Sequence, residues 1–372
     1  MARRCHRFAL ATAGVLAALL LSPASAPGQV LEPGGPAHLL PDEPAPAAAT
    51  DASGRRLWQV QRIDIAERPA HIIVTAPAAT LKTVRVESQS GAWYVLDDCA
   101  AGLCGKLVTV PHGGEGLPTD ALPGSHVALG SGRIARVWLA DPTKRIEDSP
   151  IGPWVAGTLV LEDNTTEQYR LELPLNQAFE DLRPRIADIE GNGEQTVFVV
   201  RSGIEEGAAL IALRLEGEGL LRIAAETPPA GRPQGWLIPA GIADFTGDGR
   251  KLVAAVASPD IGGELQLWDF TGHEFKRRFS VPGVSNHLPG SAIVDMAVVG
   301  DFEANQSASI ALPDAARRVI RILSFWHGEV AEPADIRLPA PVVTEIVGIA
   351  GALGARPMLL MGLEDGELVL LH

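Results

Sequence analysis

Three short loops in the second half of the chain carry oxygen-bearing side chains at regular offsets. Each loop begins with an aspartate that follows a short apolar run. Calcium takes about six to eight oxygen ligands, several of them from carboxylates. The pattern therefore predicts weak calcium binding, best at the first loop. The candidate ligands are Asp188, Glu190, Asn192 and Thr196 in the first loop, Asp244 and Asp248 in the second, and Asp301, Glu303 and Asn305 in the third.

The same loops also fit a purely structural interpretation. None of them keeps a full set of carboxylates. Leu252 stands where the second loop would need another oxygen, and Ala304 and Gln306 replace the turn glycines of the third loop. An aspartate at the start of a tight turn can instead accept hydrogen bonds from the backbone N–H groups of that turn. Both interpretations remain open from the sequence.

A second group of polar and aromatic side chains lies in or next to other connections between apolar runs. An arginine can bind a carboxylate or sulfate through two parallel hydrogen bonds, and a tryptophan can stack on a sugar ring. For each residue the alternative is an ordinary structural role, such as an ion pair or a hydrogen bond to backbone. The candidate ligand-binding residues are Arg201, Arg232, Trp236, Asp260, Asn286, His287, Asp314 and Arg317.

Motifs of known catalytic mechanism are weak in this chain. The stretch HGGEG at 112–116 is similar to an oxyanion-hole loop, but no G-x-S-x-G sequence accompanies it. The chain also lacks an H-E-x-x-H motif. We therefore predict no catalytic residue, although paired carboxylates acting on glycosides are not excluded by sequence.

The elements that hold these residues belong to an internal repeat. Asp188, Asp244 and Asp301 are spaced 56 and 57 residues apart. A degraded fourth copy has Gly351 at the equivalent position, and a fifth match upstream places Asp141 there. Each full unit holds four short runs rich in Val, Ile, Leu and Phe, which predicts four strands. Four-stranded units repeated at this spacing are typical of an all-β fold, the β-propeller.

The D-x-x-G-D-G turn of "ADFTGDG" between two apolar strands resembles the FG-GAP or VCBS-type repeat of integrin-like β-propellers. The run from "DPTKR" through "GRPQGWLIPAGIADFTGDGR" to "LPDAARR" is similar to exported bacterial proteins with that repeat. The resemblance covers about residues 125 to 372 and implies the fold more strongly than any function. We predict six four-stranded blades, within a range of five to seven. The last blade, ending GELVLLH, lacks an outer strand, which an earlier segment should supply.

In a propeller the connections between strands fall on two opposite faces. The aspartate turns would lie on one face. The second-to-third-strand turns and the blade-to-blade crossings would lie on the other. That second face would gather the turns 201–207, 258–263 and 313–318 with the crossings 228–236 and 282–291. We expect the candidate ligand-binding residues to converge there.

The N-terminal part of the chain predicts export. A basic stretch and an apolar run precede small residues, so residues 1–28 are typical of a signal peptide, cleaved after Ala24, Ala26 or Gly28; a membrane anchor is the alternative. Residues 29–54 are rich in Pro and Ala and predict a disordered linker. Residues 55–122 predict further β-structure, either one or two blades or a small accessory domain, before the propeller at 123–372.

The cysteines and the net charge bear on disulfide formation and on the class of binding partner. In a periplasmic or extracellular protein, Cys99 and Cys104 predict a local disulfide. A formal net charge of −14 opposes binding to nucleic acid. We predict a non-enzymatic binding or scaffold module that presents a polar loop face to a protein or a cell-envelope polysaccharide. The alternatives are a polysaccharide lyase or glycoside hydrolase, and an adhesion repeat stabilised by calcium.

Overall fold

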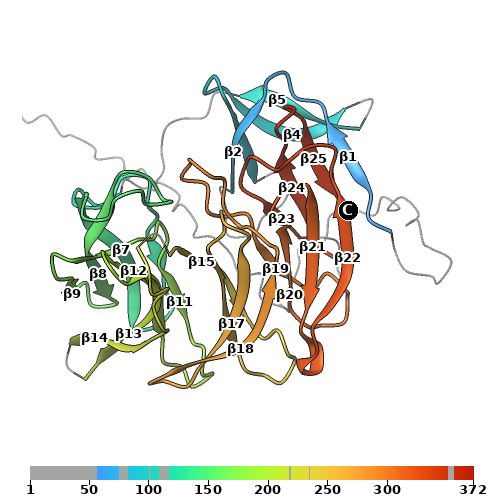
Figure 1. Cartoon of the computed structure of the whole chain (residues 1–372). Helices are drawn as coiled ribbons and strands as arrows, with labels where there is room; N and C mark the ends of the chain where they lie inside the picture. The colour runs from blue at the N-terminus through green and yellow to red at the C-terminus, as the bar shows by residue number, and fades with distance from the viewer. Residues whose placement is uncertain are drawn as a thin grey trace, which may run out of the picture.

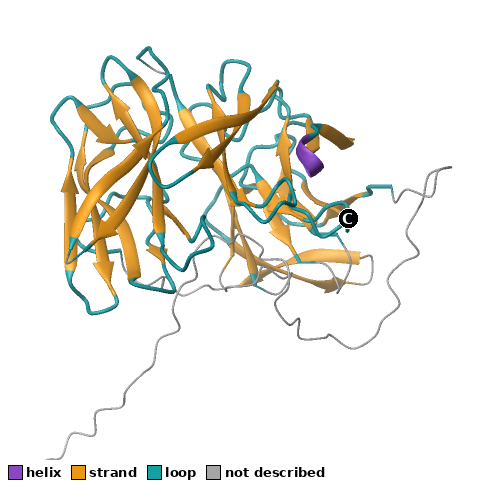
Figure 2. Cartoon of the chain, turned by 90° about the horizontal axis from the view of Figure 1, so that it is seen from below, coloured by secondary structure: helices purple, strands orange, loops and turns teal. Residues whose placement is uncertain are grey.

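The regular structure is almost entirely β-strand. The computed structural model describes residues 57–74, 83–99, 102–108, 117–217, 219–233, 235–350 and 356–372. Within these ranges the one helical element is a short 3-10 turn at Trp326–Gly328, drawn purple in Figure 2. The predicted signal peptide and linker, HGGEG and Gly351 lie outside the described residues.

The strands form six antiparallel blades (Figure 1). Blade 1 comprises β2 (Pro69–Val74), β3 (Val84–Ser88), β4 (Trp93–Cys99) and β5 (Gly102–Val108). Blade 2 comprises β6 (Ala128–Leu129), β7 (Ile134–Thr143), β8 (Val155–Asp163) and β9 (Gln168–Glu172). Blade 3 comprises β11 (Arg185–Ala187), β12 (Thr196–Gly203), β13 (Gly207–Glu216) and β14 (Leu220–Glu226). Blade 4 comprises β15 (Leu237–Ala243), β16 (Leu252–Ala257), β17 (Glu264–Phe270) and β18 (Phe275–Pro282). Blade 5 comprises β19 (Val298–Gly300), β20 (Ser309–Pro313), β21 (Val319–Ser324) and β22 (Ala331–Arg337). Blade 6 comprises β23 (Val347–Ile349), β24 (Met358–Gly362) and β25 (Leu368–Leu371), together with β1 (Val60–Ile63). A further strand, β10 (Gln177–Phe179), pairs with both β8 and β12 and joins blades 2 and 3 into one sheet.

The outer strand of blade 6 comes from the beginning of the described chain. β1 pairs antiparallel with β25, in the register Val60 opposite Leu371, and the two strands lie side by side in Figure 1. This confirms the prediction that an earlier segment supplies the missing outer strand. The N-terminal β-region thus contributes this closing strand and all of blade 1.

Burial follows from the stacking of blades. The middle strands β8 and β12 are buried along their whole length, whereas the outer strand β9 alternates between exposed and half-buried residues. Large hydrophobic clusters lie between consecutive blades; Phe198 and Val253 belong to the cluster between blades 3 and 4, and Phe245 and Ile310 to the one between blades 4 and 5. Each blade covers an apolar face that its neighbour could not cover alone.

Contacts between first strands place these strands innermost. β6 contacts β11, β15 contacts β19, β19 contacts β23, and β23 contacts β2. The order of blades in space is therefore the order in the chain, with blade 6 next to blade 1. The fold is a β-propeller of four-stranded blades, as the repeat predicted.

One sequence match was wrong. Asp141 was aligned with Asp188, which follows the first strand of its blade. The structure places Asp141 inside β7, the second strand of blade 2, with a positive φ of 55°. The first strand of that blade, β6, has only two residues, so it offered too little sequence to align.

Candidate functional site

One face of the propeller is built from the turns and crossings that the sequence grouped together. We call it the loop face. The amide of Gly231 donates to Glu206 O at 2.8 Å, and the amide of Ser258 donates to Trp236 O at 2.8 Å. The amide of Ala315 donates to Gly283 O at 3.1 Å. Each crossing is therefore tied to an adjacent turn, while the convergence of all these loops around the centre stays a prediction.

Glycine is required where a crossing packs on a turn. Gly263 has a φ of 22°, and a Cβ at this position would lie 1.7 Å from Val284 O. Gly207 occupies the equivalent place in blade 3, where a Cβ would lie 2.3 Å from Arg232 O. No side chain fits in such a gap, so both crossings lie directly on backbone.

His287 is the most strongly constrained of the candidate residues. Its side chain is fully buried, and Nδ1 lies 2.8 Å from Asp260 Oδ1. Nε2 lies 2.9 Å from Ser291 O and 3.1 Å from Pro150 O. Pro150 belongs to the turn between β7 and β8 of blade 2. A single imidazole therefore connects loops from blades 2 and 4.

The surroundings of His287 favour its charged form. Burial by itself lowers the pKa of His287, but the carboxylate of Asp260 and the two carbonyl oxygens outweigh burial and raise it. Both ring nitrogens face oxygens that can only accept a hydrogen bond, so both nitrogens donate. These surroundings therefore favour the protonated imidazole, whose two N–H groups would both find acceptors inside the protein.

Two of three further candidates, Asn286 and Arg232, also hold loops together. The buried Asn286 donates from Nδ2 to Ile238 O at 3.1 Å, and the exposed Arg232 donates from Nη2 to Ser258 Oγ at 3.1 Å. Trp236 is half-buried, and its Nε1 has no hydrogen-bond partner among the described residues. The loop face uses these polar groups mainly for its own structure.

The remaining candidates are occupied in the same way. Asp314 Oδ1 accepts the amides of Arg318 and Val319 at 2.8 and 3.0 Å, and Arg317 Nε donates to Val342 O at 3.2 Å. Arg201 was expected in a turn but lies within β12, is 4% exposed and is paired with Glu226. Its Nε and Nη1 have no hydrogen-bond partner among the described residues.

The loop face also exposes large apolar side chains. Ile204 is 49% exposed at the turn between β12 and β13, and Ile261 is 66% exposed at the turn between β16 and β17. Leu175, 80% exposed, lies beside Ile204, because the Ile204 amide donates to Asn176 O at 3.0 Å. Trp154, 43% exposed, precedes β8. We call Trp154, Leu175, Ile204 and Ile261 the apolar tips.

Sequence reasoning missed the apolar tips, although a signal was present. Ile204 and Ile261 are isolated isoleucines inside otherwise polar turns, GIEEG and SPDIGG. A large apolar side chain at the tip of such a turn has no other residue of its own blade to pack against. Such an isolated apolar residue in a polar turn was the available signal of exposed apolar surface.

The aspartate turns lie on the opposite face, and each aspartate carboxylate accepts hydrogen bonds from backbone amides of its own turn. Asp188 accepts the amides of Asn192 and Gly193 at 3.1 and 2.9 Å. Asp244 accepts those of Gly247 and Gly249 at 2.7 and 2.8 Å. Asp301 accepts those of Asn305 and Gln306 at 3.0 and 2.7 Å. In all three turns both carboxylate oxygens are used as the structural interpretation expects.

Other proposed calcium ligands are also engaged. Arg214 forms an ion pair with Glu190, and its Nε lies 3.4 Å from Thr196 Oγ1, so a cation of the protein already lies beside two of the proposed ligands. Asp248 accepts the Arg250 amide at 3.0 Å. Glu303 is exposed near a groove described below. Among the described residues, no group of three or more His, Cys, Asp or Glu side chains is placed to hold a metal ion.

Of the two cysteines predicted to form a disulfide, only Cys104 has a described side chain. Cys99 ends β4 and Cys104 lies on the adjacent β5. The side chain of Cys99 lies outside the described residues, so the pairing stays a prediction.

A cluster of charged side chains lies at the inner strands, and the sequence did not lead us to it. We call it the inner cluster. Arg183 Nη2 lies 3.0 Å from Asp295 Oδ2, and His71 Nδ1 lies 2.9 Å from Glu345 Oε1. These pairs join blade 3 to the segment before β19, and blade 1 to the segment before β23. Asp295 and Glu345 stand six residues before Asp301 and Gly351, a repeat position that could have revealed them.

The inner cluster also shifts the pKa values of its members. Desolvation raises the pKa of Asp295, but the charges of Arg183 and Arg185 outweigh it and lower the pKa overall. The hydrogen bond to Glu345 raises the pKa of His71. His126 has solvent-accessible surface, yet the protein around it and the nearby Arg183 lower its pKa to about 4. His126 is therefore neutral at pH 7.

Comparisons with known proteins reveal only remote likenesses. No family model matches the chain, and no curated protein matches it. Among solved structures, it is similar to the WD40 β-propeller domain of Doa1, with 10% identity, a TM-score of 0.33, and coverage of 85% of this chain and 96% of that one. It is also similar to BBS1N in complex with ARL6DN, with 13% identity, a TM-score of 0.34, and coverage of 82% and 78%. A third is the complex of the fission yeast SREBP–SCAP binding domains, with 12% identity, a TM-score of 0.40, and coverage of 89% and 80%. The fold assignment rests on the six blades themselves, and the FG-GAP or VCBS relationship stays a prediction.

Proposed function

We propose that this protein is a non-enzymatic binding module whose loop face docks onto a partner protein. The observation that carries the proposal is the exposure of the apolar tips, Trp154, Leu175, Ile204 and Ile261, all of which lie in second-to-third-strand turns or in a crossing between blades. Large apolar groups exposed together are a feature of protein interaction sites. The loops that carry them are held by hydrogen bonds between blades, so little conformational entropy is lost on binding.

The tips suit a protein surface better than a polysaccharide. Three of the four are aliphatic, and aliphatic groups contribute to binding by being removed from water against another apolar surface. The aromatic tip, Trp154, has the Lys144 ammonium 4.5 Å from its ring centroid. A sugar stacks on an open ring face, and here one face is already covered.

The geometry of His287 does not favour the glycoside hydrolase or lyase alternative. A general base must present a free lone pair to the substrate. His287 is fully buried, and both of its nitrogens are bonded to oxygens of the protein. The His287–Asp260 pair therefore supports the loop face structurally.

We further propose that the protein acts after export, in the periplasm or outside the cell. The basis is the sequence of residues 1–28, and N-terminal sequencing of the secreted protein tests it. No helix among the described residues has the length and apolar character to span a bilayer.

The test of the proposed function compares two charged variants. A double variant, Ile204→Asp with Ile261→Asp, places carboxylates on two tips, while Leu220→Asp changes a residue that is 61% exposed on the opposite face. Chemical cross-linking in the native cell envelope should give a protein adduct with the wild type and with Leu220→Asp, and at least tenfold less with the double variant. Equal adducts for all three proteins, or a captured fraction that is polysaccharide, would overturn the proposal.

A further inference from the structure

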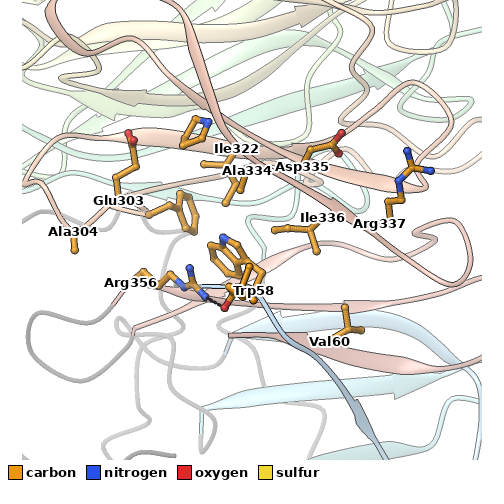
Figure 3. A pocket seen from close by; sticks show the side chains of 13 residues that line it. Trp58, Val60, Glu303, Ala304, Ile322, Ala334, Asp335, Ile336, Arg337 and Arg356 are labelled. Carbon is orange, nitrogen blue, oxygen red and sulfur yellow. Dashed lines mark hydrogen bonds between the residues drawn. The ribbon is translucent and has the colours of Figure 1, made fainter. Parts of the chain in front are cut away.

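A groove lies at the edge of the molecule, between the outer strand of blade 5 and the closing strand of blade 6. We call it the outer groove. Its volume is about 730 Å³, within the range of ligand sites, and its lining includes Trp58, Phe302 and Ile336. Figure 3 shows Trp58 and Ile336 toward its middle, with Glu303, Asp335 and Arg337 around them. The groove is far from the apolar tips in sequence and is carried by other loops and strands.

One wall of the outer groove is β22, whose outer edge pairs with no other strand among the described residues. The Leu338 amide donates to Arg318 O at 2.8 Å, and in the register of β21 and β22 Ile336 lies opposite Ile320. In an antiparallel ladder, hydrogen-bonded residues alternate with residues whose backbone groups point away from the partner strand. The N–H and C=O groups of Asp335 and Arg337 therefore point outward, along the groove.

The opposite wall is held in place. The Arg356 guanidinium lies 3.8 Å from the Trp58 ring centroid, and its Nη2 donates to Leu57 O at 2.7 Å and His372 O at 3.2 Å. Trp58 in turn packs at 6.1 Å from Phe302 of blade 5. The aromatic floor of the groove is thus fixed on both sides before any ligand arrives.

The groove is lined by charges of both signs, Glu303 and Asp335 against Arg337 and Arg356. The Arg356 guanidinium is already engaged by the Trp58 ring and by two carbonyl oxygens. Glu303 and Asp335 are exposed, and the described residues give neither of them an ion pair. The whole chain carries a formal charge of −14, which attracts basic segments. Backbone groups on a free strand edge bind an extended chain, and an apolar floor takes its alternate side chains.

We propose that the outer groove binds an extended, basic peptide segment of a partner protein by adding it as a strand to β22. One apolar side chain of the peptide would lie on Trp58 and Phe302, and a neighbouring Lys or Arg would face Glu303 and Asp335. This site is separate from the loop face and does not depend on the function proposed for it.

The test uses a random peptide library displayed on phage as the probe. Peptides selected on the purified protein should combine an apolar residue with Lys or Arg. Asp335→Pro removes an outward N–H without breaking a bond to β21, and should weaken binding of a selected peptide at least tenfold. Asp335→Lys keeps the backbone and should also weaken it. Ser280→Pro, on the outer strand of blade 4, is the matched control and should bind like the wild type.

Hydrogen exchange provides the direct readout. The amides of Asp335 and Arg337 should exchange rapidly in the free protein and become protected in the complex. Equal affinity of Asp335→Pro and Ser280→Pro, or no protection of these two amides, would overturn the proposal. So would peptide binding that appears only after residues 29–54 are deleted, because the chain would then fill its own groove. Dimerisation that Asp335→Pro abolishes would instead show a second copy as the occupant.

Discussion

At the scale of single residues, polar groups that suggested ligand binding serve to join loops. Asn286 and His287 are fully buried, and each connects segments far apart in the chain. Sequence identified both as chemically important, but it could not show burial, because burial depends on which blades meet above them. The exposed Ile204 illustrates the reverse case, an apolar residue whose exposure follows from the geometry of the turn.

We predict that Asp260→Asn destabilises the protein in a pH-dependent way. The variant leaves a buried imidazolium without its carboxylate, a loss of about 3 kcal/mol in the free energy of unfolding. The pKa of His287 is raised in the folded state, so the stabilisation is complete below the unfolded value of 6.5 and is lost as pH rises through the folded value. Urea denaturation from pH 5 to 9 should show the difference from wild type shrinking at high pH.

The control for this variant is Glu274→Gln, an exposed residue at the turn between β17 and β18. It should leave stability unchanged throughout the pH range. A difference between Asp260→Asn and wild type that is constant from pH 5 to 9 would mean that His287 is not charged in the folded protein.

At the scale of elements, the aspartate turns show how far a repeated motif predicts structure. The spacing of Asp188, Asp244 and Asp301 correctly located the first-to-second-strand turns. It could not distinguish a metal ligand from a turn cap, because both uses need the same carboxylate at the same place. Arg214, the ion-pair partner of Glu190, comes from another strand of the blade and has no fixed offset from the motif, so the sequence could not reveal it.

We predict that Asp188→Ala costs about 1 to 2 kcal/mol in the free energy of unfolding, because two backbone amides lose their acceptor. The cost should be the same in excess calcium and in excess chelator. Glu194→Ala, an exposed residue of the same turn, is the control and should be neutral. A melting temperature of the wild type that falls on chelation would instead establish calcium binding.

At the scale of the whole molecule, the repeat predicted the class of fold and its number of blades, but not every boundary. Blade 2 departs most from the pattern, since its first strand has two residues and β10 fuses it to blade 3. The inner cluster was also beyond the sequence, because its two ion pairs, His71 with Glu345 and Arg183 with Asp295, each join segments of different blades and form only when those blades are assembled.

We predict that Gln61→Pro destabilises the whole propeller by about 3 kcal/mol, because the Gln61 amide points toward β25. The bonds between Gln59 and His372, at 3.0 and 3.2 Å, fix this alternation along β1. Val60→Pro is the matched control, since the Val60 amide points outward and its loss breaks no ladder bond. Thermal unfolding compares the two; similar melting temperatures would mean that β1 adds little to the stability of blade 6.

The pairing of β1 with β25 has a consequence for how the protein is made. Among the described strands, β1 is synthesised before all the others and its partner β25 after all the others. Blade 6 therefore cannot be completed until β25 has been made. In the interval the edge of β1 that pairs with β25 has no partner, so closure of the ring is a late event in the formation of this fold.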